Sequence, residues 1–385
     1  MDKEKKVLFV LDTLGVGGAE ISVVELVKHI TQFQVSVCVI YKSSHELLDQ
    51  LISQGINVKL LQIEKRFGFL EAVLKLRKVL KEEKPDIVHA NHFRSEIISR
   101  IIVPFFKIPL LGTLISDSHS RERYELVSRR ERLKLEIYRY MNKVTVFRCN
   151  FFLSVSNSIV EPNIKYLNIP KNKISVIPNG RDITKYLNIQ PIKRELINNS
   201  IGPNDILIVS NSRVIKSKGF DEIFKAFRIL TKKFNNLYLI IVGDGYDFEK
   251  YKEFCSKLRI QHKVVFLGSR LDMAEILKAC DIFWFASHYE GSPGVIIEGM
   301  LSKLPIIASN ISPVTENLIH GKNSLLFEMG SEIDLTCQTE FLLQNWEIKD
   351  SLVNNSFQLA LEKFDIKKIA LMHEDIYQSI INREL

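Results

Sequence analysis

Short apolar runs alternate with longer amphipathic segments along the whole chain. In the first half these runs have the length of buried strands and cover residues 7–11, 35–41, 58–63, 86–90, 110–115 and 151–155. Between them lie segments such as 69–81, in which Leu70, Val73 and Leu74 recur at helical spacing. Because alternating strands and helices build a parallel sheet covered on both faces, the pattern predicts an α/β fold.

The same pattern restarts after residue 205. A second series of strand-length runs covers residues 206–209, 237–242, 264–267, 281–285 and 305–308, and the polar stretch 182–205 is interpreted as a linker. We therefore expect two Rossmann-like, doubly wound domains, residues 1–185 and 186–365, which also suits a chain of 385 residues. Ligands bind beyond the carboxyl ends of parallel strands, so two such sheets facing each other predict an interdomain cleft.

Positive charge is concentrated in the first of these domains. The net charge of the chain is +8, with +10 in residues 1–185 and −2 in the remainder. The segment 121–148 alone holds nine Lys and Arg against four Asp and Glu. Such a patch suits nucleic acid, an anionic lipid surface or a phosphorylated substrate, and a solvated helix face has the same composition.

No segment indicates export or a membrane anchor. The first residues lead into a strand pattern without a signal peptide, and charges and prolines interrupt the most apolar stretch, 97–115. Five scattered cysteines without a CxxC pair predict a reduced, cytoplasmic chain with no zinc site.

Two glutamates bracket a loop that leads from a strand into a helix. Glu290 and Glu298 are separated by seven residues, GSPGVII. Backbone N–H groups at a helix start attract anions, whereas carboxylates suit hydroxyls such as those of a ribose and a hexose. Glutamates that only cap the helix or face solvent would produce the same spacing.

Two cations follow the first strand of the second half. Arg213 can bind a diphosphate through two parallel hydrogen bonds, and Lys218 adds a point charge, each contributing ~1.5–3 kcal/mol. The alternative is a pair of surface cations. A helix start disfavours positive charge, however, so their position before a helix favours an anion site.

The glycine-rich segments do not form a dinucleotide fingerprint. The segment 15–20, GVGGAE, and the segment 243–245, GDG, both lack the last glycine of G-x-G-x-x-G, so a dehydrogenase is poorly supported. Glycine in the first segment lets backbone approach a ligand, or forms a tight turn.

His119 follows a strand closely enough to face the cleft, although a lone histidine is as often structural. The chain contains no Asp-x-Asp, which predicts a diphosphate site neutralised by protein cations without a metal.

Together these segments resemble the family-4 retaining glycosyltransferases of the GT-B fold, of the type that makes bacterial surface polysaccharides. The resemblance covers nearly the whole chain and rests on the order and spacing of short motifs. These are GGAE at 17–20, DIVH at 86–89, VSN at 155–157, IPNGRD at 177–182, Arg213 with Lys218-Gly219, VGDG at 242–245, Glu290 with Glu298, PVTE at 313–316 and GKNSLLF at 321–327.

The resemblance implies a role for individual residues. Arg213 and Lys218 would bind the donor diphosphate, Glu298 the ribose hydroxyls and Glu290 the transferred hexose. His119 would complete the catalytic set of Glu290, Arg213 and Lys218. The remaining donor contacts implied are Gly17, Gly18, Gly268, Arg270, Pro293, Gly294 and Val295. The implied donor is a nucleotide-diphosphate sugar, with uracil as the commonest base of the family, and no cofactor is implied.

Two positions depart from the family pattern. Pro293 stands where the loop after the first glutamate commonly has glycine, and glycine follows at 294. Arg181 replaces the usual small apolar residue in the Asn-Gly-x-Asp turn, and the sequence offers no interpretation of it.

The resemblance also implies what the basic first half of the chain binds. In this fold the first domain takes the acceptor, so a glycan or lipid-linked acceptor and peripheral binding to the anionic inner face of the cell membrane are expected, without a nucleic-acid partner. Retention by front-face attack is implied, and the last helix, within 366–385, should pack back on the first domain.

Three alternatives to sugar transfer stay open. A nucleotide-sugar epimerase or hydrolase of the same fold would consume donor without an acceptor. A non-catalytic nucleotide- or glycan-binding protein would keep Arg213 and show no turnover. A dehydrogenase would need to bind a nicotinamide cofactor.

Overall fold

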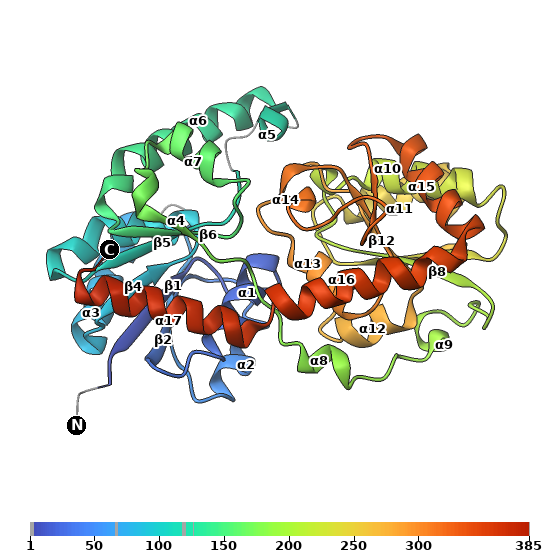
Figure 1. The fold of residues 1–385 in the computed structure, drawn as a ribbon. Coiled ribbons are helices and arrows are strands. Elements are labelled where there is room, and N and C mark those ends of the chain that lie inside the picture. The colour runs from blue at the N-terminus through green and yellow to red at the C-terminus, as the bar shows by residue number, and fades with distance from the viewer. Residues whose placement is uncertain (1–3, 66–67, 118–120, 126, 385) are drawn as a thin grey trace. The chain divides into compact units, whose positions relative to one another are not determined.

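The computed structural model describes residues 4–65, 68–117, 121–125 and 127–384 of the chain. The chain divides into two compact units. Unit 1 contains Met1–Gly180 and Ile366–Leu385, and unit 2 contains Arg181–Asp365. Each unit is built on one parallel sheet with helices around it (Figure 1).

The sheet of unit 1 has the strand order β3-β2-β1-β4-β5-β6-β7. Its strands are β1 (Lys6–Leu11), β2 (Gln34–Tyr41), β3 (Asn57–Ile63), β4 (Ile87–Ala90), β5 (Leu110–Leu114), β6 (Phe151–Ser154) and β7 (Ile174–Val176). Its α-helices are α1 (Gly18–Val27), α2 (Leu48–Ile52), α3 (Phe69–Glu83), α4 (Phe93–Ile102), α5 (Arg121–Glu125), α6 (Arg129–Thr145), α7 (Val160–Leu167) and α17 (Ile366–Asn382). Short 3₁₀ helices cover η1 (Val103–Phe106), η2 (Val146–Arg148) and η3 (Lys171–Lys173).

Both faces of this sheet are buried, which explains why its strands are continuous apolar runs. Leu8 and Val10 of β1 join the core under α3 and α4, whereas Phe9 and Leu11 join the core formed with α1 and α17. The C-terminal helix thus covers one apolar face of a sheet whose strands all lie in the first 180 residues (Figure 1).

Unit 2 repeats the arrangement with the strand order β10-β9-β8-β11-β12-β13. Its strands are β8 (Ile206–Asn211), β9 (Leu237–Val242), β10 (Val264–Phe266), β11 (Ile282–Phe285), β12 (Ile306–Ser309) and β13 (Leu325–Phe327). Its α-helices are α8 (Thr184–Leu187), α9 (Arg194–Ile197), α10 (Phe220–Leu230), α11 (Phe248–Lys257), α12 (Met273–Ala279), α13 (Gly294–Leu301), α14 (Ser312–Thr315), α15 (Glu332–Gln344) and α16 (Lys349–Lys363). The 3₁₀ helices are η4 (Lys216–Lys218) and η5 (Trp346–Ile348).

The structure contains every strand that the apolar runs predict and two more. The additional strands, β7 and β13, have three residues each and lie at sheet edges, where no long apolar run is needed. The stretch interpreted as a linker forms α8 and α9 instead. Tyr186, Ile197 and Ile201 of that stretch are buried in the core of unit 2, so it is part of the domain. Among the helices of the described residues, none combines the length and apolarity that a bilayer crossing requires.

Candidate active site

The predicted cations and glutamates of unit 2 lie beyond the carboxyl ends of the strands of its sheet. β8 and β11 are neighbours, and the chain leaves them in opposite directions, toward β9 and toward β12. Their carboxyl ends therefore form the topological switch point, where doubly wound sheets bind ligands. Arg213 and Lys218 follow β8, and Glu290 and Glu298 follow β11.

Lys218 and Glu290 form an ion pair at this end of the sheet. Lys218 Nζ lies 2.5 Å from Glu290 Oε1, and the two side chains are 20% and 17% exposed. Gly219 makes this approach possible. Its φ is +72°, and an added Cβ would lie 2.0 Å from the carbonyl oxygen of Ala286 at the end of β11. Only glycine therefore fits between Lys218 and the loop that carries Glu290.

A second set of contacts holds the two loops together. The His288 amide donates to the Ser217 carbonyl at 2.9 Å, and His288 Nε2 lies 3.1 Å from Glu222 Oε1. Burial would raise the pKa of Glu222, but the hydrogen bond with His288, together with weaker backbone and charge interactions, lowers it. Glu222 is thereby kept as a carboxylate beside the Lys218 loop.

Arg213 is exposed and forms no ion pair with a described residue. Its loop is held by the glycines of the GDG segment. A Cβ on Gly243 would lie 2.1 Å from the Ser212 carbonyl oxygen, and one on Gly245 would lie 2.3 Å from that of Val214. These glycines therefore serve close backbone packing beneath Arg213 rather than a dinucleotide fingerprint.

Glu298 lies inside α13 and is 6% exposed. Its Oε1 accepts a hydrogen bond from Arg181 Nε at 2.8 Å, and its Oε2 accepts one from Asn211 Nδ2 at 3.3 Å. The sequence did not identify these two partners. In the sequence, Arg181 was noted only as an unusual residue in a turn. No sequence motif indicated Asn211, because its approach to Glu298 depends on the pairing of β8 with β11.

The loop between the two glutamates ends in a helix start. Pro293 precedes α13 as its N-cap, no side chain caps that terminus, and Gly294 and Val295 begin the helix. Their amides lie at the positive end of the helix dipole, in line with the expected phosphate or sugar contacts.

The remaining donor-site residues of unit 2 lie at the end of β10. Gly268 has φ +65°, and its carbonyl oxygen accepts from the Gly243 amide at 2.8 Å. Gly268 therefore lies next to the GDG segment at the carboxyl end of the sheet. Arg270 donates to Asp272 at 2.7 and 2.5 Å, and these hydrogen bonds raise the pKa of Arg270. Its guanidinium is therefore engaged by its own turn.

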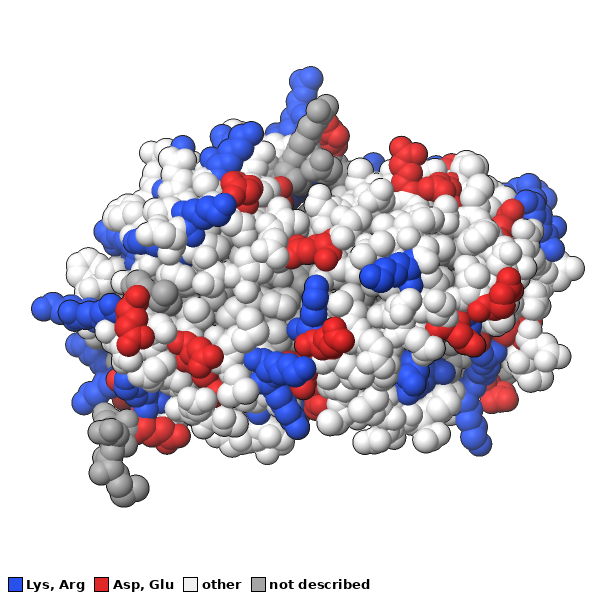
Figure 2. Space-filling model, viewed as in Figure 1, with Lys and Arg blue, Asp and Glu red and all other residues white. Residues whose placement is uncertain are grey.

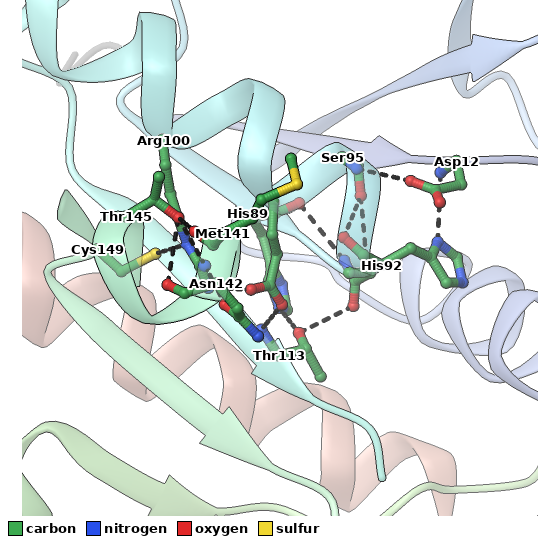
Figure 3. Close-up of polar contacts among 12 residues, drawn as sticks. Asp12, His89, His92, Ser95, Arg100, Thr113, Met141, Asn142, Thr145 and Cys149 are labelled. Atoms are coloured by element: carbon green, nitrogen blue, oxygen red, sulfur yellow. Dashed lines mark hydrogen bonds and ion pairs between the residues drawn. The ribbon is translucent and has the colours of Figure 1, made fainter. Parts of the chain in front are cut away.

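Unit 1 presents a polar cluster at its own switch point, between β1 and β4. Asp12 accepts from the Ser95 amide at 2.6 Å, and the Asp12 amide donates to His92 Nδ1 at 3.3 Å (Figure 3). Asp12 also accepts from Arg94 Nε at 2.8 Å. His92 Nε2 is buried, forms no hydrogen bond with a described residue and lies 4.0 Å from Glu20 Oε1. Sequence analysis singled out Glu20, in the GGAE motif, but not Asp12, Arg94 or Ser95.

Gly17 and Gly18 lie beside this cluster, as the N-cap and first residue of α1. A Cβ on Gly18 would meet nothing within 4 Å, so packing inside unit 1 does not require glycine there. His119, the expected catalytic histidine, lies outside the described residues.

A buried arginine, which sequence analysis noted only as an interruption of an apolar run, ties α4 to α6. Arg100 is fully buried and donates to Glu96, Asn142 and Cys149 (Figure 3). Glu96 also accepts from the Thr113 amide at 3.1 Å. Glu96 and Arg100 both belong to α4, so their ion pair lies within that helix, and the hydrogen bond from Arg100 to Asn142 connects α4 to α6.

Known proteins resemble both units. A model of glycosyltransferase family 4 matches residues 16–185, and a model of glycosyl transferases group 1 matches residues 192–359. The chain is 26% identical to an Escherichia coli UDP-Gal:alpha-D-GlcNAc-diphosphoundecaprenol alpha-1,3-galactosyltransferase, over 81% of this chain and 75% of that one. It is 23% identical to the capsular polysaccharide biosynthesis glycosyltransferase CapM of Staphylococcus aureus, over 82% of each.

Another match covers less of its relative. A Methanocaldococcus jannaschii protein described as an uncharacterized glycosyltransferase is 27% identical over 63% of this chain and 60% of its own length. Among solved structures, Anabaena HepE in complex with UDP and glucose superposes with a TM-score of 0.82, at 21% identity, over 97% of this chain and 100% of that one.

Two Rossmann-like units, with cations and glutamates at a switch point, define a glycosyltransferase of the GT-B fold. Its first domain belongs to glycosyltransferase family 4 and its second to the glycosyl transferases of group 1. Of the two relatives with described functions named above, one is a galactosyltransferase that acts on a diphosphoundecaprenol-linked sugar and the other belongs to capsular polysaccharide biosynthesis.

Proposed function

We propose that this glycosyltransferase moves a hexose or N-acetylhexosamine from a UDP-sugar to a glycan or lipid-linked acceptor of a cell-surface polysaccharide. The observation that carries the proposal is the grouping of Arg213, Lys218, Glu290 and Glu298 at one switch point. The names of the relatives support it, since one transfers galactose from UDP-Gal to a diphosphoundecaprenol-linked sugar and another builds a capsule.

The chemistry proposed is retaining and needs no metal. The bond from C1 of the sugar to the diphosphate breaks as the acceptor oxygen attacks C1 from the same face, and the acceptor proton passes to the leaving phosphate. Arg213 and Lys218 stabilise the charge that grows on that phosphate, together with the helix start at Gly294. Glu290 binds the sugar hydroxyls while Lys218 neutralises it.

Removing either cation tests this proposal. We expect Arg213→Ala and Lys218→Ala each to lower kcat/KM by about 10- to 100-fold, because each removes a charge-assisted hydrogen bond. Lys216→Ala is the matched control, since Lys216 is an exposed cation of the same 3₁₀ helix. Rates are measured as UDP release with and without acceptor extracts, with circular dichroism as the check on folding.

Three outcomes would contradict the proposal, the first its mechanism and the other two sugar transfer itself. Near-normal rates in both variants would remove the cations from the mechanism. Donor consumption that is complete without acceptor would indicate an epimerase or hydrolase. UDP binding without turnover on any acceptor would indicate a binding protein.

We further propose that α6 docks unit 1 on an anionic membrane. Lys and Arg are interspersed with Asp and Glu on the face in Figure 2, so charge alone marks no docking surface there. On α6 and η2, apolar side chains recur at spacings of four and three residues and are 45% to 72% exposed, namely Leu133, Ile137, Tyr140, Val144 and Phe147. This set, the α6 stripe, follows one helix face.

The charges around the α6 stripe favour an anionic partner. Six of the 17 residues of α6 are Lys or Arg and two are Glu. An exposed apolar stripe flanked by basic side chains suits the interface of an anionic bilayer, where a lipid-linked acceptor would also lie. Arg100 and the buried Leu135 hold the opposite face of α6 on the unit.

A further inference from the structure

The two departures from the family pattern meet in the structure. Arg181 is the first residue of unit 2, and its backbone amide donates to the Phe364 carbonyl at 2.9 Å. Its side chain is 3% exposed and runs toward α13. A Cβ on Gly294 would lie 1.8 Å from Arg181 Nη2, so the guanidinium occupies the space that a side chain at 294 would need. A side chain at 294 would therefore displace the Arg181 guanidinium.

The same guanidinium fixes the expected ribose partner. Arg181 Nε donates to Glu298 Oε1 at 2.8 Å, and both side chains are more than nine-tenths buried. Asn211 holds the other carboxylate oxygen from β8. Glu298 is thus held from two elements, in one orientation, at the end of the sheet where the diphosphate is expected.

Electrostatics gives a second reason for the contact between Arg181 and Glu298. A bare carboxylate at the donor site would repel a diphosphate, and a buried one would also lose the stabilisation that water gives it. Arg181 compensates the charge of Glu298 and leaves its oxygens as hydrogen-bond acceptors. The usual small apolar residue at this turn position could do neither.

We infer that Arg181 is a positioning residue of the donor site, which orients and neutralises Glu298 and so sets the selectivity for ribose hydroxyls. The inference rests on the proposed donor site and extends it to a residue that does not itself touch the donor. Arg181 acts through Glu298, so its effect should depend on the presence of both that carboxylate and the hydroxyls.

The test compares UDP with 2′,3′-dideoxy-UDP by isothermal titration calorimetry. Wild type should bind UDP more tightly, by about 10- to 100-fold, because the dideoxy compound has no ribose hydroxyls that could donate hydrogen bonds to Glu298. Arg181→Met should bring the ratio of the two dissociation constants close to one. In steady-state assays it should raise KM for the donor and change kcat less than about threefold.

Two further variants keep the test decisive if Arg181→Met folds poorly. Gly294→Ala keeps every charge but displaces the guanidinium, and should reduce the same ratio. Gly202→Ala, whose Cβ would be 3.4 Å from Asp205, is the control and should leave it unchanged. In a Glu298→Gln background, Arg181→Met should change the ratio no further, since both residues act on one contact.

The outcomes separate this inference from the proposed function. An unchanged ratio in Arg181→Met and Gly294→Ala would overturn the inference and leave the donor site standing. A wild type that binds none of UDP, ADP and GDP would overturn the donor site and the inference with it.

Discussion

Individual residues in this protein are constrained by backbone approach as much as by side-chain chemistry. Gly219 illustrates this, because the carbonyl of Ala286 lies where its Cβ would be. The motif Lys218-Gly219 therefore combines a cation for the donor with the one residue that lets the cation reach Glu290.

Gly219→Ala should be more destabilising than glycine replacement at a similar backbone angle elsewhere. Gly330 is the matched control, since its φ of +84° resembles the +72° of Gly219 but a Cβ there meets nothing within 4 Å. Gly330→Ala should cost about 1–2 kcal/mol from the left-handed conformation alone. Gly219→Ala should cost about 1–3 kcal/mol more from overpacking, measured by urea unfolding, and should weaken UDP binding. Equal losses in the two variants would contradict the proposed role of Gly219.

Single residues also limit what sequence analysis can find. Arg213, Lys218, Glu290 and Glu298 were predicted from motifs whose order along the chain matches a known family. Arg181 was noticed only as an exception, because its partner lies 117 residues away and neither position has a local pattern that names the other.

At the scale of elements, α6 combines two different surfaces on one helix. Its inner face contacts Arg100 through Asn142 and packs Leu135, while its outer face carries the α6 stripe. The basic segment 121–148 was predicted as a patch, but the sequence left open whether it was a solvated face. The exposed apolar side chains, which only the structure reveals, favour a membrane.

Disrupting the α6 stripe should weaken membrane binding without unfolding the protein. Ile137→Asp with Tyr140→Asp should lower binding to anionic vesicles by at least about tenfold, because both apolar contact and charge attraction are lost. Leu70→Asp is the control, since Leu70 on α3 is 76% exposed and lies outside the stripe.

Sedimentation with phosphatidylglycerol vesicles at low and high salt measures this effect. Wild-type binding should fall as salt screens the surface charges, and neutral phosphatidylcholine vesicles should bind less. Equal sedimentation of wild type and the double variant would show that another surface, or none, docks on lipid.

For the molecule as a whole, the C-terminal helix makes unit 1 depend on both ends of the chain. Tyr377 and His373 of α17 pack against His89 of β4, and Tyr377 Oη lies 2.8 Å from His89 Nδ1. Burial lowers the pKa of His373 to about 4 and lowers the pKa of His89 well below its ordinary value. Both imidazoles are therefore neutral in the folded state.

Acid should loosen the packing of α17 on unit 1. The unfolded chain binds a proton on His373 near pH 6.5 and the folded chain only near pH 4, so stability is complete above pH 6.5 and falls as the pH drops toward 4. His373 alone should cost about 1.4 kcal/mol between pH 7.5 and 5.5. Hydrogen exchange of α17 measures this, and His373→Leu should reduce the pH dependence by that amount. An identical dependence in the variant would exclude His373 as a cause.

The sequence by itself determined the two parallel sheets, the positions of most strands along the chain and the residues of the donor motifs, because apolar periodicity and loop chemistry are local properties. Tertiary structure decided the rest. It joined Arg181 to Gly294 and Glu298, made the presumed linker part of unit 2, and turned a basic segment into a helix with an exposed apolar stripe. These features depend on contacts between residues far apart in the chain, and such contacts exist only once the sheets have brought their elements together.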